Sequence, residues 1–171
     1  LIVGWFQGAM EFGERALGNR SILADPRDPL AKDKINSAIK FREHFRPFAP
    51  AVLEEYAGQY FNLPKCSPET PFMEKIFTIK KEKQALIPSV VHVDGTGRLQ
   101  TVNKMQNGRF YSLIYEFYQL TGVPIVINTS LNRNGEPMAC SPKDAMGIFW
   151  GSSLDAIILG NHVVIKSPGF K

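Results

Sequence analysis

The hydrophobic residues follow two different periods along the chain, and together these predict a mixture of helices and strands. Apolar residues spaced by three and four positions from Phe110 onward predict a helix that ends at Gly122. A second, weaker helical period covers residues 30–45, and the hydroxyl of Ser141 marks the start of a third helix. A short helix is also expected over residues 54–61.

Short apolar runs rich in β-branched residues predict the strands. These runs cover residues 1–6, 21–24, 72–79, 98–102 and 123–128. Near the end of the chain two further runs flank Gly160-Asn161, a dipeptide typical of a two-residue hairpin turn. Helices interspersed with strands predict an α/β (α+β) fold, with a twisted, mixed open sheet and flanking helices. We expect one domain over residues 1–171, and the pattern leaves the order of the strands open.

The composition is that of a protein with a sizeable core. Hydrophobic residues make up 44% of the 171 positions, and no apolar run is long enough to cross a bilayer. The first residues carry neither an initiator Met nor the features of a signal peptide. We therefore expect a cytoplasmic chain without a membrane partner, cut from a longer protein whose upstream part is missing.

Cysteine and histidine are too few and too scattered to predict a disulfide or a metal site. Cys66 and Cys140 form no CxxC pair, so two ordinary buried thiols in a reducing compartment are expected. His44, His92 and His162 lack the spacing of metal ligands. We expect no metal site built by this chain alone.

Positive charge is concentrated at the beginning of the chain. The formal net charge is +4, and the first 46 residues carry eight Lys and Arg side chains. A solvated helix face explains the lysines, whereas the arginines stand among Gly, Asn and Ser residues. Planar guanidinium groups in such segments favour an anionic ligand, with RNA as the competing interpretation.

Residues 11–21 form the first of three polar clusters. Its glycines, Gly18 among them, let the backbone approach a ligand, and Arg15 and Arg20 offer guanidinium forks for phosphate or carboxylate. The uncharged donors of this cluster are Asn19 and Ser21. A tight turn with two surface arginines explains the composition equally well.

Residues 92–102 form the second cluster. On a strand, Arg98 and Gln100 share one face and could line a cleft, although an exposed hairpin face explains them better on pattern alone. His92 by itself fits a hydrogen-bonded structural histidine better than a catalyst.

The third cluster, residues 128–137, directly follows a predicted buried strand, and ligands of open α/β sheets bind at the carboxyl ends of strands. Asn128, Ser130 and Asn132 can donate to and accept from a sugar or a phosphate. A polar turn is the alternative, but the number of polar residues favours a ligand.

Taken in order, the clusters resemble the C-terminal domain of the O-carbamoyltransferase family, which includes nodulation, cephalosporin and aminoglycoside carbamoyltransferases. The motifs that carry the resemblance are Glu11-Phe12-Gly13, Arg15-Ala16-Leu17-Gly18-Asn19-Arg20-Ser21, Phe45-Arg46-Pro47-Phe48-Ala49-Pro50, His92-Val93-Asp94-Gly95-Thr96, Arg98, Gln100-Thr101-Val102, Asn128-Thr129-Ser130, Asn132 and Gly135-Glu136-Pro137. Three positions depart from the pattern: Glu14 stands in place of proline, Leu131 of phenylalanine and Gly97 of alanine. None of the three removes a polar contact residue.

The resemblance implies a fold similar to that of the threonylcarbamoyl-adenylate synthases and a reaction in two stages. In the first stage this domain would form carbamoyl-adenylate from carbamoyl phosphate and ATP, with Mg²⁺ held largely by the nucleotide. In the second stage a separate N-terminal domain, with its own metal, would pass the carbamoyl group to a hydroxyl acceptor.

The resemblance also implies roles for particular residues. Guanidinium groups would stabilise the charge that develops on the phosphate, and the catalytic candidates are Arg15, Arg20 and Arg46. The binding candidates are Gly18, Asn19, Ser21, His92, Arg98, Gln100, Asn128, Ser130 and Asn132. The expected partners are ATP, carbamoyl phosphate and the N-terminal domain, with a homodimer left open and no specific nucleic acid. The alternative is an RNA- or nucleotide-binding module without catalysis. The compact Gly/Asn/Ser motifs favour a site for a small ligand over a surface for nucleic acid.

Overall fold

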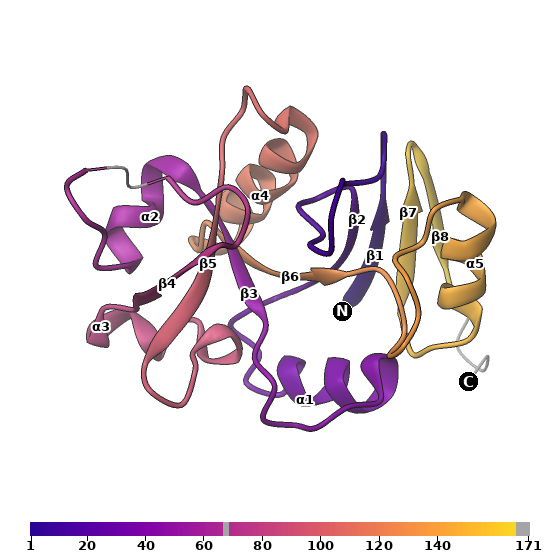
Figure 1. Ribbon diagram of the computed structural model, residues 1–171, viewed down its shortest axis with the longest axis horizontal. Helices are drawn as coiled ribbons and strands as arrows, with labels where there is room; N and C mark the ends of the chain where they lie inside the picture. The colour runs from indigo at the N-terminus through magenta and orange to yellow at the C-terminus, as the bar shows by residue number, and fades with distance from the viewer. Residues whose placement is uncertain (67–68, 167–171) are drawn as a thin grey trace. The chain divides into compact units, whose positions relative to one another are not determined.

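The computed structural model describes residues 1–66 and 69–166, and it divides into two compact units (Figure 1). Unit 1 comprises Leu1–Ala24, Leu30–Arg46 and the chain from Asn128 onward, and unit 2 comprises Asp25–Pro29 and Pro47–Ile127. Because the chain passes repeatedly from one unit to the other, neither is a contiguous sequence domain. The expectation of a single domain stays a prediction.

Unit 1 contains a mixed sheet. Its elements are β1 (Ile2–Phe6), β2 (Arg20–Ala24), α1 (Ala31–Ile35), a π-helix η1 (Asn36–Lys40), the end of β6 (Ile125–Ser130), α5 (Pro142–Trp150), β7 (Ala156–Leu159) and β8 (His162–Ile165). Strand β1 is antiparallel to β2 and parallel to β7, and β7 is antiparallel to β8. Helix α5 packs on β1 and β7, where Phe149 and Ile157 are fully buried.

Two local predictions in unit 1 are confirmed. The Ser141 hydroxyl accepts a hydrogen bond from the backbone N–H of Asp144, whose carboxylate in turn accepts from the N–H of Ser141, so α5 begins with a capping box. Strands β7 and β8 form the expected hairpin, and Gly160 adopts the positive φ, 61°, that such a turn needs.

The helix expected over residues 30–45 is shorter than predicted. It starts after Leu30, continues through η1 and ends at Phe41, which has a φ of 47° in the left-handed region. The cause is the buried side chain of Asn36, whose amide donates to the carbonyl oxygens of His44 (3.3 Å) and Arg46 (3.0 Å). These bonds fold residues 42–46 back over the helix end instead of letting them continue it.

Unit 2 also contains a mixed sheet, so the predicted α/β class is confirmed in both units. Its elements are β3 (Ala49–Leu53), α2 (Glu54–Tyr60), β4 (Lys75–Thr78), α3 (Lys81–Gln84), a 3-10 helix η2 (Pro88–Val90), β5 (Thr96–Val102), α4 (Gly108–Thr121) and the start of β6. Strand β5 is parallel to β3 and antiparallel to β4. Helix α4 ends at Gly122, which has a φ of 73°, as its sequence predicted.

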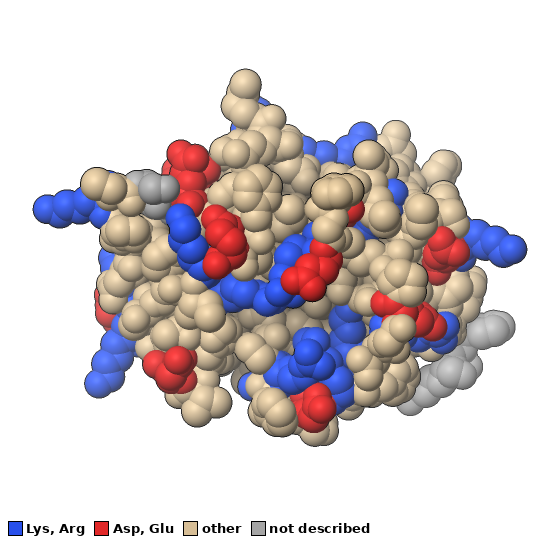
Figure 2. All heavy atoms as spheres, in the orientation of Figure 1, with Lys and Arg blue, Asp and Glu red and all other residues tan. Residues whose placement is uncertain are grey.

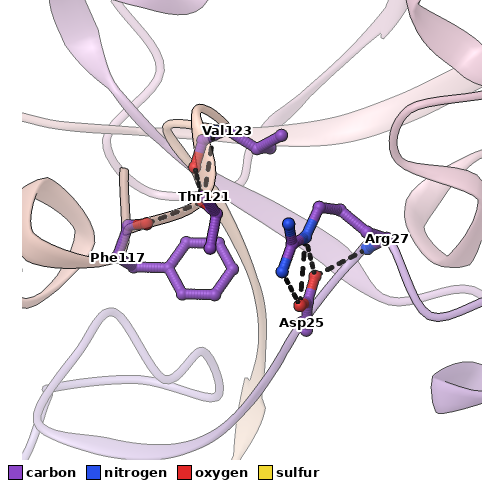
Figure 3. A network of polar contacts seen from close by, with 5 residues as sticks. All are labelled: Asp25, Arg27, Phe117, Thr121 and Val123. Atoms are coloured by element: carbon purple, nitrogen blue, oxygen red, sulfur yellow. Dashed lines mark hydrogen bonds and ion pairs between the residues drawn. The ribbon is translucent and has the colours of Figure 1, made fainter. Parts of the chain in front are cut away.

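Arg27, one of the early arginines, is committed to a contact inside unit 2. Its guanidinium forms three hydrogen bonds to the carboxylate of Asp25, the shortest from Nη2 to Oδ2 at 2.7 Å, and it stands 5.7 Å from the ring centroid of Phe117. Figure 3 shows this fork beside the Phe117 ring. Arg27 therefore explains part of the early positive charge without any ligand.

Candidate functional site

The buried side chain of Lys40 is the centre of the candidate site in unit 1. Lys40 is the last residue of η1 and is 4% exposed. Its Nζ lies 2.6 Å from both the carbonyl oxygen of Ser130 and Oδ1 of Asn132. The carbonyl oxygen of Asn132 and the Ser130 hydroxyl follow at 3.0 and 3.2 Å. The amine is thus surrounded by oxygen atoms from the last residue of β6 and from the turn that follows it.

Burial lowers the pKa of Lys40 to about 7, and the positive charge of nearby Arg42 adds to the decrease. Near neutral pH the side chain is therefore divided between its ammonium and amine forms. A negative charge brought close to Nζ would favour the ammonium form.

The turn that receives Lys40 is held by its own side chains. The Ser130 hydroxyl donates to Oδ1 of Asn132 at 2.6 Å, and Nδ2 of Asn132 donates to the carbonyl oxygen of Glu136 at 2.6 Å. The guanidinium of Arg133 binds both carboxylate oxygens of Glu136, which keeps the pKa of that carboxyl below its usual range. This network fixes the orientation of the predicted residues Ser130 and Asn132.

Asn36 places further positive charge beside Lys40. Its Oδ1 accepts a hydrogen bond from Nε of Arg42 at 2.7 Å, while its Nδ2 holds the backbone of the segment that leads to Arg46. The side chain of Arg46 is exposed, with Nη1 3.9 Å from Oε2 of Glu43. On the face in Figure 2, acidic side chains lie next to basic ones, also where Figure 1 places α1.

Residues 11–20 form a loop that closes on the carboxylate of Glu11. Its Oε1 accepts hydrogen bonds from the backbone N–H groups of Leu17 (2.7 Å) and Asn19 (2.8 Å), with the N–H of Arg20 at 3.4 Å. Nδ2 of Asn19 donates to the carbonyl oxygen of Ala9 at 2.9 Å. The backbone donors of this glycine-containing loop are therefore directed at a carboxylate of the protein itself.

The two arginines of this loop have different environments. Arg20 is 4% exposed, and its guanidinium donates to four carbonyl oxygens and stacks 3.6 Å above the ring centroid of Phe6. Those carbonyls belong to Gln7, Gly8, Asn19 and Ala139. Burial lowers the pKa of Arg20, opposed by the charge of Glu11. Arg15 is instead exposed and pairs with Glu14 at 3.1 Å, so its fork can reach a ligand.

Unit 1 brings the first and third sequence clusters together. The N–H of Leu131 donates to the carbonyl oxygen of Arg20 at 2.8 Å, and Nδ2 of Asn128 donates to the carbonyl oxygen of Ala16 at 3.1 Å. Asn128 is 1% exposed and Ser21 is fully buried. The carbonyl oxygen of Gly18 accepts from the indole of Trp5 at 2.8 Å, which ties this glycine to β1. Gly18, Ser21 and Asn128 thus lie in the buried part of unit 1 that supports the segments carrying Arg15 and Ser130.

The second cluster lies in unit 2 and is organised around His92. The hydroxyl of Thr96 donates to Oδ1 of Asp94 at 2.6 Å, and its oxygen lies 3.0 Å from Nδ1 of His92. Because the Thr96 proton points to Asp94, the Thr96 oxygen accepts from Nδ1–H, which selects that tautomer of His92. Hydrogen bonds from Thr96 hold the pKa of Asp94 below its usual range.

Strand β5, which follows His92, is largely buried and is not the exposed face of a hairpin. Strand β5 is paired on both sides, and Gln100 is 3% exposed opposite Ala51 of β3. Arg98 is half-buried opposite Ile76 of β4. The exposed-face alternative is therefore wrong for Gln100. Whether His92, Arg98 and Gln100 bind a ligand stays a prediction.

Lys40 and Asn36 were not identified from the sequence as residues of this arrangement. The role of the Glu11 carboxylate as a hydrogen-bond acceptor for the loop was not identified either. Asn36 and Lys40 lie four residues apart beside the buried Ile35 and Ile39, and all four are largely removed from solvent. A polar pair at helical spacing next to an apolar stripe was the signal that could have identified Lys40. The role of Glu11 depends on loop geometry that no spacing reveals.

The two cysteines differ from their prediction, and the described residues contain neither a metal-binding cluster nor a membrane-spanning helix. Cys66 and Cys140 are exposed free thiols, so the expectation of buried thiols was wrong. Within residues 1–66 and 69–166, no group of three or more His, Cys, Asp or Glu side chains could hold a metal ion. Over the same residues, the helices are too short or too polar to span a membrane.

Comparison with known proteins gives a consistent set of matches. The family model described as Carbamoyltransferase C-terminus matches residues 1–166. Nodulation protein NolNO of Sinorhizobium fredii is 48% identical over 165 residues, covering 96% of this chain and 24% of that protein. Nodulation protein NolO of Bradyrhizobium diazoefficiens is 46% identical over 167 residues, covering 98% of this chain and 30% of that protein. Nodulation protein U of Sinorhizobium fredii is 42% identical over 151 residues, covering 87% and 25%. The chain therefore spans under a third of the length of these relatives.

Proposed function

Because the chain belongs to the carbamoyltransferase family and corresponds to its C-terminal domain, we propose that it takes part in ATP-dependent transfer of a carbamoyl group to a hydroxyl. In this proposal the domain binds carbamoyl phosphate and ATP in the cytoplasm and joins them as carbamoyl-adenylate. The hydroxyl acceptor is bound by the rest of the full-length protein, whose own metal serves the transfer step.

The proposed chemistry has three bond exchanges. Water displaces phosphate from carbamoyl phosphate and leaves carbamate. A carbamate oxygen then attacks the α-phosphorus of ATP, the bond to the β-phosphate breaks, and pyrophosphate leaves with its Mg²⁺. Finally the acceptor oxygen attacks the carbamoyl carbon, loses its proton, and AMP leaves. No nucleophile from the protein is needed, so positioning and charge stabilisation carry the catalysis.

The observation that supports the first two steps is the environment of Lys40. Carbamate and ATP repel each other, and an ammonium held among oxygen atoms beside Arg42 offsets part of that repulsion. A pKa of about 7 lets the side chain gain its proton as the anions arrive. Ser130 and Asn132 supply the hydrogen-bonding partners that fix the amine.

Other residues are given supporting roles in this proposal. Arg15 and Arg46 are exposed arginines that can bind phosphate oxygens through their planar forks. Arg20, whose guanidinium N–H groups donate to backbone carbonyl oxygens, stabilises the loop that presents Arg15. Mg²⁺ is carried by the nucleotide, since the proposal requires no metal ligand from this domain.

The test is calorimetry with MgATP on the full-length enzyme and on the same enzyme carrying Lys40→Met. We expect micromolar to millimolar binding by the wild type and at least tenfold weaker binding by the variant, since the variant lacks both the positive charge and the amine that holds Ser130 and Asn132 in place. Lys81→Met, a change of an exposed lysine in α3, is the matched control and should bind as the wild type does. Equal affinities for all three proteins would remove Lys40 from the nucleotide site.

A further inference from the structure

The loop between Glu11 and Arg20 is closed at one atom. Three backbone N–H groups, those of Leu17, Asn19 and Arg20, converge on Oε1 of Glu11 at 2.7, 2.8 and 3.4 Å. Hydrogen bonds to an ionised acceptor are about twice as strong as those between neutral groups. The carboxylate therefore acts as the internal anion around which this loop is wound.

The closure leaves a short tip exposed to solvent. Phe12 has no protection from solvent, Gly13 has a φ of 114°, and the side chain of Arg15 is 43% exposed. At the far side of the tip, Ala16 is 3% exposed and its carbonyl oxygen accepts from Asn128. The tip is thus a bridge of four residues, 12–15, between two fixed points.

The remaining contacts of the loop hold its base. Arg20 binds the carbonyl oxygens of Gln7 and Gly8, and Asn19 binds that of Ala9. These bonds join the two ends of the loop behind the tip. Glu11 stands directly before the tip, and its carboxylate determines where the tip begins.

We propose that Glu11 is a positioning residue that acts through Arg15. Its carboxylate closes the loop before any reactant arrives, so that the backbone carrying Arg15 does not have to be ordered when the guanidinium binds an anion. This inference rests on the proposed function, because it needs an anionic reactant at Arg15. Replacing the carboxylate by an amide keeps the length of the side chain and a carbonyl acceptor, but weakens the closure.

The test is a double-mutant cycle on the full-length enzyme with Glu11→Gln, Arg15→Ala and the two together. We expect Glu11→Gln to raise the KM for carbamoyl phosphate or ATP roughly tenfold with a much smaller change in kcat. In the double variant Glu11→Gln should add nothing to the effect of Arg15→Ala, since the partner it acts through is gone. Additive effects would overturn the proposal, because they would mean that Glu11 acts independently of Arg15.

A structural readout accompanies the kinetics. Amide hydrogen exchange at Leu17 and Asn19 should be faster in Glu11→Gln, while exchange in α4 stays unchanged. Glu116→Gln, an exposed change on α4, is the matched control for both measurements. If Glu11→Gln fails to fold, Gly13→Ala replaces it, because an alanine at φ 114° strains the tip where nothing lies within 4 Å of the added carbon. An unchanged KM in Gly13→Ala would then overturn the proposal.

The same cycle is run on the Kd for inorganic phosphate, so that Glu11 and the proposed function are judged separately. If the wild type binds phosphate but shows no ATP-dependent transfer, the proposed function is contradicted. The cycle on the Kd for phosphate would then still decide whether Glu11 acts through Arg15. A wild type that neither binds phosphate nor transfers carbamoyl groups would overturn both.

Discussion

The Nζ atom of Lys40 lies 2.6 Å from Oδ1 of Asn132, although the two residues are 92 positions apart in the chain. The bond joins the end of η1 to the turn after β6, which belongs to the third sequence cluster. It also holds the lysine in a buried position, whereas most lysines of folded proteins lie at the surface. Lys40 is consequently the residue whose replacement tests the site most directly.

Lys40→Met should strongly reduce ATP-dependent carbamoyl transfer by the full-length enzyme. The change removes the positive charge near the reacting anions, which should lower the rate roughly ten- to a hundredfold. It also leaves Ser130 and Asn132 without their donor, which should lower the stability of the fold by about 1–3 kcal/mol. Lys40→Arg should not restore activity, since a guanidinium is too large for the space between four oxygen atoms. Transfer at the wild-type rate by Lys40→Arg would show that charge alone is required.

The buried amine also predicts how stability depends on pH. The pKa of Lys40 falls from 10.5 to about 7 on folding, so between these values the unfolded chain binds a proton that the folded chain does not. The contribution of Lys40 to the free energy of unfolding should therefore rise as the pH increases from about 7 to 10.5, by at most roughly 1.4 kcal/mol per pH unit. Below pH 7 this contribution should no longer change with pH.

The difference in free energy of unfolding between wild type and Lys40→Met isolates this effect. Urea unfolding of both proteins at several pH values between about 6 and 9 provides the measurement. Above pH 7 the wild type should gain stability relative to the variant. A constant difference across the series would contradict the low pKa.

Arg20→Lys should destabilise the protein, whereas Arg15→Lys should mainly reduce its activity. One ammonium cannot reach the dispersed carbonyl oxygens that the guanidinium of Arg20 binds, and each buried carbonyl left unpaired costs about 1–3 kcal/mol. Arg15 is exposed, so its replacement should leave the melting temperature close to that of the wild type. Thermal melting and carbamoyl transfer, measured on both variants, give the comparison. If Arg20→Lys melts as the wild type does while activity is lost, Arg20 contacts a reactant after all.

RNA should bind only weakly and lose most of its affinity as salt is added. Two arginines outside the proposed site are already paired with nearby carboxylates, which lowers the positive potential available to phosphates along a strand. These pairs are Arg27–Asp25 and Arg133–Glu136. Fluorescence anisotropy with a single-stranded RNA from 50 to 200 mM salt is the measurement. Tight binding at the higher salt, without competition by ATP, would favour the nucleic-acid alternative.

Elements fixed by neighbouring residues were predictable from the sequence. The apolar period of α4 with Gly122 at its end, the Ser141–Asp144 capping box and the Gly160 hairpin each depend on contacts within a few positions. The helix over residues 30–45 was predicted too long because Asn36 captures carbonyl groups of the following segment. Propensity and period contain no information about such a capture.

The site was predictable in part, for the same reason. Ser130 ends β6, Asn132 lies just after it, and both were predicted as binding residues, whereas their partner Lys40 is known only once distant segments are paired. The ligand-binding role expected for Arg20 stays a prediction, because an arginine among glycines has the same composition whether it binds phosphates or carbonyls. Its four backbone partners have no side-chain signature, so only the fold distinguishes the two roles.

The π-helix that carries Lys40 has a consequence for insertions and deletions. In η1 the N–H of Phe41 bonds to the carbonyl oxygen of Asn36, five residues back, so this turn holds one residue more than an α-helical turn would. Deleting one residue here would restore the α-helical register and rotate the following side chains by about 100° around the axis. The ammonium would then point away from Asn132. The length of residues 31–40 is therefore a stricter requirement for this site than the identity of exposed residues within it, such as Ser37.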